Sequence, residues 1–217
     1  MINDYWAEPI VESEGFSLTE LMVAASLMLV VVAAAWLSIT AVNNMMDSIF
    51  AREQANRAGS VAVERFASDL REGWAPVADL SPTPFRTWTA SKAEFYLFDP
   101  VTSRVTLVKY YTSADATGST YTLYRAQGVT STAISASSIT SATSFAYSGA
   151  QVVAKKLTGG SIFLYYQAAP GLPAATVSTP PAGVGVTVGT TASVGKFTAN
   201  VSSQSFTQMR TRSVFTQ

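Results

Sequence analysis

One segment limits what this 217-residue chain can fold into: residues 21–46 are 26 consecutive residues without a charged side chain. A helix rises about 1.5 Å per residue, so roughly 20 apolar residues cross a bilayer core of about 30 Å. Residues 21–42 are therefore long enough to form a transmembrane helix. A cleavable secretory signal fits less well, because its apolar core is usually about 7–15 residues long and follows a basic stretch. A helix buried in a globular core would be unusually long and uniform, so a membrane-spanning helix is the favoured interpretation.

The helical pattern continues beyond the apolar segment. No proline occurs between Phe16 and Arg71, and Gly59 is the only glycine in that range. We therefore predict one helix over residues 16–72, with its transmembrane part at about 21–42 and a half outside the membrane at 43–72. Gly59 marks either a close contact or a bend, and the alternative is a break there into two helices. Small and apolar residues of this half recur at steps of three and four, which predicts a narrow stripe that packs against a sheet: Ala55, Gly59, Ala62, Val63, Phe66 and Leu70.

The charged residues of the same half are spaced for pairing along a solvated helix face. Glu53 and Arg57 lie four residues apart, as do Arg65 and Asp69, and opposite charges at that spacing attract each other. Prolines at positions 76, 82 and 84 predict that the helix ends near Gly73 and that a loop follows it.

Beyond residue 73 the sequence changes to short runs rich in β-branched and aromatic residues. Residues 94–98, 104–111 and 120–125 predict three strands of an antiparallel meander, and residues 161–167 predict a further strand. Residues 184–188, 196–201 and 205–215 are weaker strand candidates. The Ser/Thr-rich residues 131–148 and the proline-rich residues 170–181 predict connections. The expected fold class is α+β: one long N-terminal helix packed against an antiparallel β-sheet head over residues 73–217.

The composition excludes most catalytic chemistry. The chain has no histidine and no cysteine, so it lacks a thiol nucleophile, an imidazole acid–base group and an ordinary zinc site, and it forms no disulfide. From residue 73 onward the carboxylates are Asp79, Glu94, Asp99 and Asp115, which are too scattered to predict paired-acid catalysis or a calcium site. A lysine-assisted serine nucleophile stays open, but no spacing singles one out. We therefore expect no catalytic residue, no cofactor and no metal, and a protein that is not an enzyme.

Two basic pairs and one triplet have both a functional and a plain interpretation. Lys155 and Lys156 precede a Gly-Gly turn, and Arg210 and Arg212 would share one face of a strand. Each pair is either an anion-binding or subunit-docking patch or part of a solvated strand face, and we favour the solvated face. The triplet that begins at Asn200 matches a glycosylation site, but such triplets often arise by chance. Contact with DNA is conceivable, but no interleaving of aromatic and basic residues indicates it.

The residues that lead into the apolar segment carry the most specific motif. The sequence Glu-Gly-Phe-Ser-Leu-Thr-Glu-Leu-Met at positions 14–22 resembles the N-terminal signal of type IV prepilins and pseudopilins. The resemblance implies that residues 1–15 are a leader peptide, that a prepilin peptidase cuts between Gly15 and Phe16, and that Phe16 becomes N-methylated. It also implies that Glu20 pairs with the N-terminus of a neighbouring subunit during filament assembly.

The physical chemistry of Glu20 gives an independent reason to expect a partner. A carboxylate at the edge of a spanning helix is costly unless water, headgroups or a cation compensate it. The alternative is an interfacial residue near the helix N-terminus, where a negative charge is favoured anyway. We favour the assembly role because of the Gly-Phe-Ser-Leu context.

The rest of the chain has a weaker similarity to minor pilins and pseudopilins of the PilW and PulJ/GspJ type, in residues 62–72 and in the runs VKYY, TLYR and FLYYQ. The resemblance implies a structural subunit of a type IV pilus or type II secretion filament, made as a single-pass inner-membrane precursor with its head outside the cytoplasm. Its expected partners are the prepilin peptidase/N-methyltransferase, other pilins or pseudopilins, the inner-membrane assembly platform, and membrane lipid before assembly. The alternative is a membrane-tethered adhesin or binding module that does not polymerise.

The chain departs from the family pattern in its leader. Residues 1–15 contain four acidic and no basic residues, whereas residues 73–217 contain ten basic and four acidic ones. Prepilin leaders are usually basic, and the positive-inside rule expects Lys and Arg on the cytoplasmic side. Thr19 also departs, because the family more often has an aliphatic residue before the glutamate. Removal of the leader would leave a mature chain whose head carries a net positive charge.

Overall fold

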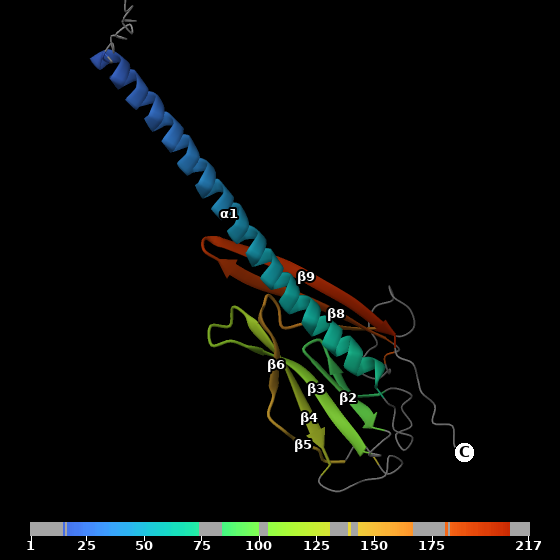
Figure 1. Cartoon of the computed structure of the whole chain (residues 1–217). Helices are drawn as coiled ribbons and strands as arrows, with labels where there is room; N and C mark the ends of the chain where they lie inside the picture. Colours follow the sequence, from blue (N-terminus) through green and yellow to red (C-terminus); the bar gives the residue numbers. More distant parts are fainter. Residues whose placement is uncertain are drawn as a thin grey trace, which may run out of the picture. The chain divides into compact units, whose positions relative to one another are not determined.

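A computed structural model describes Gly15, residues 17–73, 84–99, 104–130, 139, 143–166, 181 and 183–208 (Figure 1). Within these described residues one helix, α1, runs from Leu18 to Arg71, and nine antiparallel strands form one sheet. The chain divides into two compact units, residues 1–46 and residues 47–217. The predicted α+β class, a long N-terminal helix against an antiparallel sheet, is confirmed.

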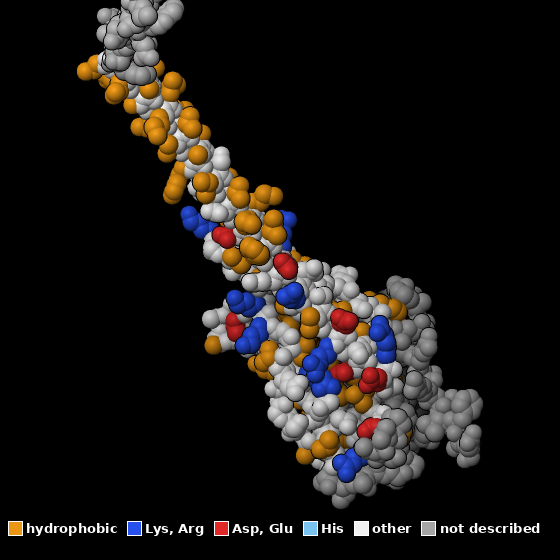
Figure 2. Space-filling model, in the orientation of Figure 1, with side chains coloured by type: hydrophobic (Ala, Val, Ile, Leu, Met, Phe, Trp, Pro, Cys, Tyr) orange, Lys and Arg blue, Asp and Glu red, His pale blue; other side chains and the backbone are white. Residues whose placement is uncertain are grey.

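The described residues of the first unit are the N-terminal part of α1. Every side chain of residues 17–46 that the structure describes is exposed, including large ones such as Leu27, Leu29 and Trp36. Figure 2 shows hydrophobic side chains covering this part of the helix. It is long and apolar enough to cross a membrane, and an apolar surface of this extent is stable in lipid rather than in water.

The second unit contains the remainder of α1 and the sheet. The strand order is β1-β2-β3-β4-β6-β8-β7, with β5 paired to β4 and β9 paired to β8. The strands are β1 (Phe85–Thr89), β2 (Lys92–Asp99), β3 (Arg104–Ala114), β4 (Tyr121–Val129), β5 (Ala146–Tyr147), β6 (Gln151–Leu157), β7 (Phe163–Tyr166), β8 (Gly183–Val194) and β9 (Phe197–Gln208).

The predicted meander is confirmed, since β2 pairs with β3 and β3 pairs with β4. Gly118 supplies the positive φ of 69° in the turn between β3 and β4, a conformation that costs glycine little. The same turn is held by Asp115, whose carboxylate accepts hydrogen bonds from Thr117 and Thr120. These bonds lower the pKa of Asp115 to about 2, and they give this acid a structural role.

The predicted stripe on α1 is the face that packs on the sheet. All six of its residues are buried, together with Ala51 and Ala67. Phe66 is 1% exposed and lies 5.1 Å from the Tyr110 ring and 5.1 Å from the Phe163 ring, measured between centroids. This contact forms the centre of the main core. A second apolar cluster on the other face of the sheet contains Tyr96, Val105, Leu107, Ile139 and Phe145.

Gly59 is a site of close contact, and the alternative of two helices broken at this residue is wrong because α1 is continuous. A Cβ atom added to Gly59 would lie 2.7 Å from Oγ of Ser203 in β9. Next to it, the Thr190 hydroxyl of β8 donates a 2.6 Å hydrogen bond to the backbone carbonyl of Ala55. The β8–β9 hairpin therefore approaches the helix backbone at Ala55 and Gly59, and Figure 1 shows the hairpin beside α1.

Other sequence expectations need correction. Asp69 does not pair along the helix with Arg65; it pairs across to Arg125 of β4, at 2.6 Å. The strands β1 and β6 were not predicted, and β8 and β9 are longer than their predicted cores. The strand expected at 205–215 forms the end of β9 as far as Gln208. The rest of that range lies outside the described residues. Residues 170–180 of the proline-rich connection also lie outside them.

Candidate functional site

The predicted processing and assembly residues lie at the start of α1. Gly15 is exposed and precedes the helix, Phe16 lies outside the described residues, and Glu20 is in the first helical turn. Gly15 and Ser17, which flank Phe16 in the sequence, are both exposed.

Glu20 forms a reciprocal cap with Ser17. The Ser17 backbone N–H donates to Oε2 of Glu20 at 3.0 Å, and the Glu20 backbone N–H donates to Oγ of Ser17 at 3.2 Å. This arrangement is a capping box, which satisfies two backbone donors that a helix otherwise leaves unpaired. Sequence reasoning missed the role of Ser17, although Ser-x-x-Glu before an apolar run is the signature of such a cap.

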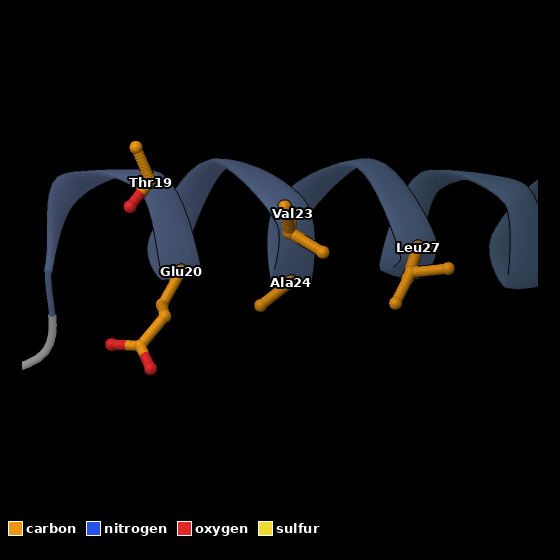
Figure 3. A pocket seen from close by; sticks show the side chains of 5 residues that line it. All are labelled: Thr19, Glu20, Val23, Ala24 and Leu27. Carbon is orange, nitrogen blue, oxygen red and sulfur yellow. The ribbon is translucent and has the colours of Figure 1, made fainter.

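An apolar strip continues from Glu20 along the same side of the helix (Figure 3). Thr19, Glu20, Val23, Ala24 and Leu27 line a shallow hollow of about 330 Å³. Because the residues at 20, 24 and 27 follow helical spacing, one carboxylate is placed at the polar end of an exposed apolar surface. Such a surface can receive an apolar helix, and the carboxylate can receive a cationic or N–H donor at its end.

A second charged group connects the C-terminal half of α1 to the sheet. Oδ2 of Asp69 accepts hydrogen bonds from Nε of Arg125 at 2.6 Å and from the Tyr110 hydroxyl at 2.7 Å. Burial and the Asp69 charge raise the pKa of Tyr110 well above its usual range. Burial alone would lower the pKa of Arg125, but Asp69 outweighs it and raises that pKa. Tyr110 therefore stays neutral and Arg125 stays protonated at neutral pH, which suits a structural anchor rather than proton transfer.

A third group lies on the opposite face of the sheet around Glu94. Its carboxylate is 2.9 Å from Nζ of Lys92 and 4.0 Å from Nζ of Lys109, and it accepts a 3.2 Å bond from the Tyr147 hydroxyl. Burial raises the pKa of Glu94, but the hydrogen bond and charge of Lys92 prevail and lower it. Lys109 also lies 4.9 Å from the centroid of the Tyr111 ring. Aromatic and basic side chains do meet here, but Glu94 already engages both lysines, so the group is not a free phosphate-binding surface.

The remaining candidates stay separate. Lys155 and Lys156 are both exposed, and Lys156 has a φ of 59° where the register between β4 and β6 shifts. Asn200 is exposed on β9, and its side-chain oxygen accepts a 2.7 Å hydrogen bond from Thr191. Asp79, Arg210 and Arg212 lie outside the described residues. Within the described part of the chain, no group of three or more acidic residues could hold a metal ion.

Comparison of the chain with protein-family models, with characterised proteins and with solved structures gives no match.

Proposed function

We propose that this protein is a structural subunit of the type IV pilin and pseudopilin class, most similar to its minor members. It is made as a single-pass membrane precursor, cut between Gly15 and Phe16, and assembled into a filament through its N-terminal helix. The supporting observation is the design of α1, which has an exposed apolar part long enough to span a membrane and a second part whose stripe belongs to the core of a β-sheet unit.

This helix suits both the proposed membrane-bound precursor and the proposed filament. In the precursor the apolar part lies in lipid. In the filament it packs among equivalent helices, and since lipid and a helix bundle are both apolar, the transfer carries no large hydrophobic penalty. A single polar residue in such a bundle fixes the register between helices, and Glu20 is the acidic residue in the first turn of α1.

Cleavage changes what Glu20 meets. Removal of residues 1–15 creates a cationic amine at Phe16, and the carboxylate of Glu20 on a neighbouring chain is its proposed partner. The Ser17 backbone N–H already donates to Oε2 of Glu20. Among the described residues no donor pairs with Oε1, so this oxygen can accept a hydrogen bond from another chain. The cap thus holds the carboxylate near the helix start while one oxygen stays available.

The processing step predicts a defined N-terminus. Chemical sequencing or mass spectrometry of the membrane-extracted protein, from cells with an active prepilin peptidase, is expected to begin at N-methylated Phe16. The control is the same measurement with Gly15→Trp, because a large side chain beside the scissile bond should leave residues 1–15 attached. An intact Met1 in the unmodified protein would contradict the proposal.

The assembly step predicts a separation of processing from incorporation. Glu20→Ala is expected to leave cleavage intact but to lower the amount of protein in sheared filaments at least about tenfold, which corresponds to roughly 1.4 kcal/mol of lost pairing energy. Glu20→Gln retains a capping amide without the charge, so it should assemble as poorly as the alanine variant if pairing with an amine is the cause.

Glu53→Ala is the matched control, because it removes another exposed acid from the same helix and should leave incorporation within about twofold. Normal incorporation of Glu20→Ala would remove the assembly role from this residue. Absence of the wild-type protein from sheared filaments would favour the alternative, a membrane-tethered binding module.

A further inference from the structure

Among the residues that the structure describes, β9 is an edge strand of the sheet. It pairs with β8 through twelve successive residue pairs without a register shift, from Phe197↔Val194 to Gln208↔Gly183. On its other side the described residues provide no pairing strand. A full-length edge of this kind carries a row of backbone N–H and C=O groups that are ready to pair with another chain.

The strand itself lacks the features of sequence and length with which proteins usually block such pairing. Edge strands are protected by charged side chains, by proline, by bulges or by being very short. The sequence of β9, FTANVSSQSFTQ, contains no charged residue and no proline. By contrast, the two strands at the ends of the strand order are short. β1 has five residues and a register shift, and β7 has four residues.

A groove runs along this edge and is bounded on its other side by the C-terminal half of α1. One part, of about 820 Å³, is lined by Asn200, Val201 and Ser202 of β9 and by the helix residues at 49, 52, 53 and 56. The next part, of about 530 Å³, is lined by residues 202–205 of β9 and by helix residues between Asn56 and Arg71. Ser202 and Asn56 line both parts, so the two parts of the groove are adjacent.

The residues that line the groove indicate that it lies along the edge of β9 rather than on one face of the sheet. Successive residues of a strand point to opposite faces, yet residues 200–205 all line the groove in sequence. Three consecutive residues line one part and four line the other, which indicates that the groove lies along the strand edge, where every residue presents backbone atoms. At about 3.3 Å per residue these six residues span roughly 20 Å, which matches a partner segment of about six residues.

Charge on the helix wall indicates what such a segment carries. Glu64 and Arg71 both line the second part of the groove and lie roughly 10 Å apart along the helix axis. Helix and strand run in the same direction past the groove. The earlier helix residue, Asn56, lines it together with residues 200–202, and the later one, Arg71, lines the part that extends to Ser205. A segment antiparallel to β9 would therefore meet Arg71 first and Glu64 afterwards, and an acidic residue followed by a basic one four positions later would complement both.

We propose that residues 200–205 of β9 form a docking edge that binds an extended segment of another protein chain by β-strand addition, with α1 as the second wall. A second copy of this chain fits less well. Strand β9 has no charged side chain with which a second copy could complement Glu64 and Arg71. The proposal does not depend on filament assembly.

The test uses the full chain in detergent and a fluorescent seven-residue peptide of sequence threonine–aspartate–threonine–valine–threonine–lysine–threonine, with both ends blocked. Fluorescence anisotropy is expected to show saturable binding. The same peptide with alternate backbone nitrogens methylated keeps every side chain but loses ladder donors, so its binding should be at least about tenfold weaker. A peptide with aspartate and lysine exchanged should also bind more weakly, because each would then face a like charge.

Protein variants locate the binding site. Ser202→Lys and Gln204→Lys place a charge on exposed positions of the edge and are expected to weaken binding at least about tenfold. Val152→Lys is the matched control, because Val152 is an exposed strand residue of β6 that does not line the groove, and its binding should stay within about twofold.

Three results would overturn the proposal. They are equal binding of the methylated and unmethylated peptides, no effect of either β9 lysine, and no saturable binding up to about 1 mM peptide. The cysteine-free sequence allows a further check, in which Gln204→Cys and Val152→Cys are compared for disulfide-linked dimers under mild oxidation. Preferential dimerisation through position 204 would identify a second copy as the occupant and would likewise reject the proposal.

Discussion

Replacement of Phe66 with alanine is expected to lower the free energy of unfolding of the second unit by about 3–5 kcal/mol. The side chain is 1% exposed, and its ring contacts Phe95, Tyr110 and Phe163 with centroid distances of 5.8, 5.1 and 5.1 Å. Its removal leaves a cavity between helix and sheet that neither can close without losing other contacts. Urea denaturation of the full chain in detergent, followed by near-ultraviolet circular dichroism of the tyrosines, measures the effect.

Two control variants distinguish packing from helix propensity. Phe50→Ala makes the same chemical change in α1 at a side chain that is 50% exposed, so it should change the unfolding free energy by no more than about 0.5 kcal/mol. Phe66→Leu retains much of the buried volume and should cost less than the alanine variant. If Phe50→Ala and Phe66→Ala had equal effects, the packing of α1 on the sheet described above would be wrong.

Replacement of Asp69 with alanine is expected to destabilise the second unit by about 3–5 kcal/mol, because it leaves the Arg125 charge buried without its partner. The Arg125 side chain is 8% exposed, and Asp69 also accepts the Tyr110 hydroxyl bond. Asp69→Asn keeps a hydrogen-bond acceptor but not the charge and should fall between the alanine variant and the wild type. The same urea titration measures these variants.

A double variant separates the value of the pair from the cost of breaking it. Asp69→Leu combined with Arg125→Met removes both charges and should be more stable than either single variant, since buried ion pairs are often replaceable by apolar residues. A coupling energy of about 0.5–3 kcal/mol is expected from the double-mutant cycle. Additive effects of the two single substitutions would show that Asp69 and Arg125 act independently and would contradict the anchor role.

The parts of the fold that follow from local periodicity could be predicted from the sequence. The stripe on α1 recurs at steps of three and four residues, and the strands of the meander are rich in β-branched and aromatic residues. In contrast, β6 could not be recognised from the sequence, because Lys155 and Lys156 interrupt its strand pattern. The structure accommodates these two lysines where the register between β4 and β6 shifts. β1 could not be recognised because proline-rich residues precede Phe85. The length of the β8–β9 hairpin could not be predicted because its strands contain many small polar residues. This hairpin packs closely against Gly59.

The candidate site was predictable to the extent that it is local. Glu20 follows from a contiguous motif, and Ser17 could have been found from its spacing to Glu20. Asp69 could not be assigned correctly, because its partner Arg125 is 56 residues away and the nearer Arg65 offers an equally good local pairing. The groove beside β9 was beyond sequence reasoning, since it depends on which strand of the folded sheet remains unpaired.

The contact between the hairpin and α1 has a consequence for the order in which the molecule forms. The hydrogen bond from Thr190 to Ala55 joins residues 135 positions apart, and contacts of such long range form late in folding. Chains are also synthesised from the N-terminus, so the small-residue side of α1 exists long before β8 and β9 can cover it. Until then, a helix surface of alanines and glycine is open to any other strand or helix that can approach closely. The nascent chain is therefore the stage at which this protein is most exposed to mispairing and to capture by a chaperone.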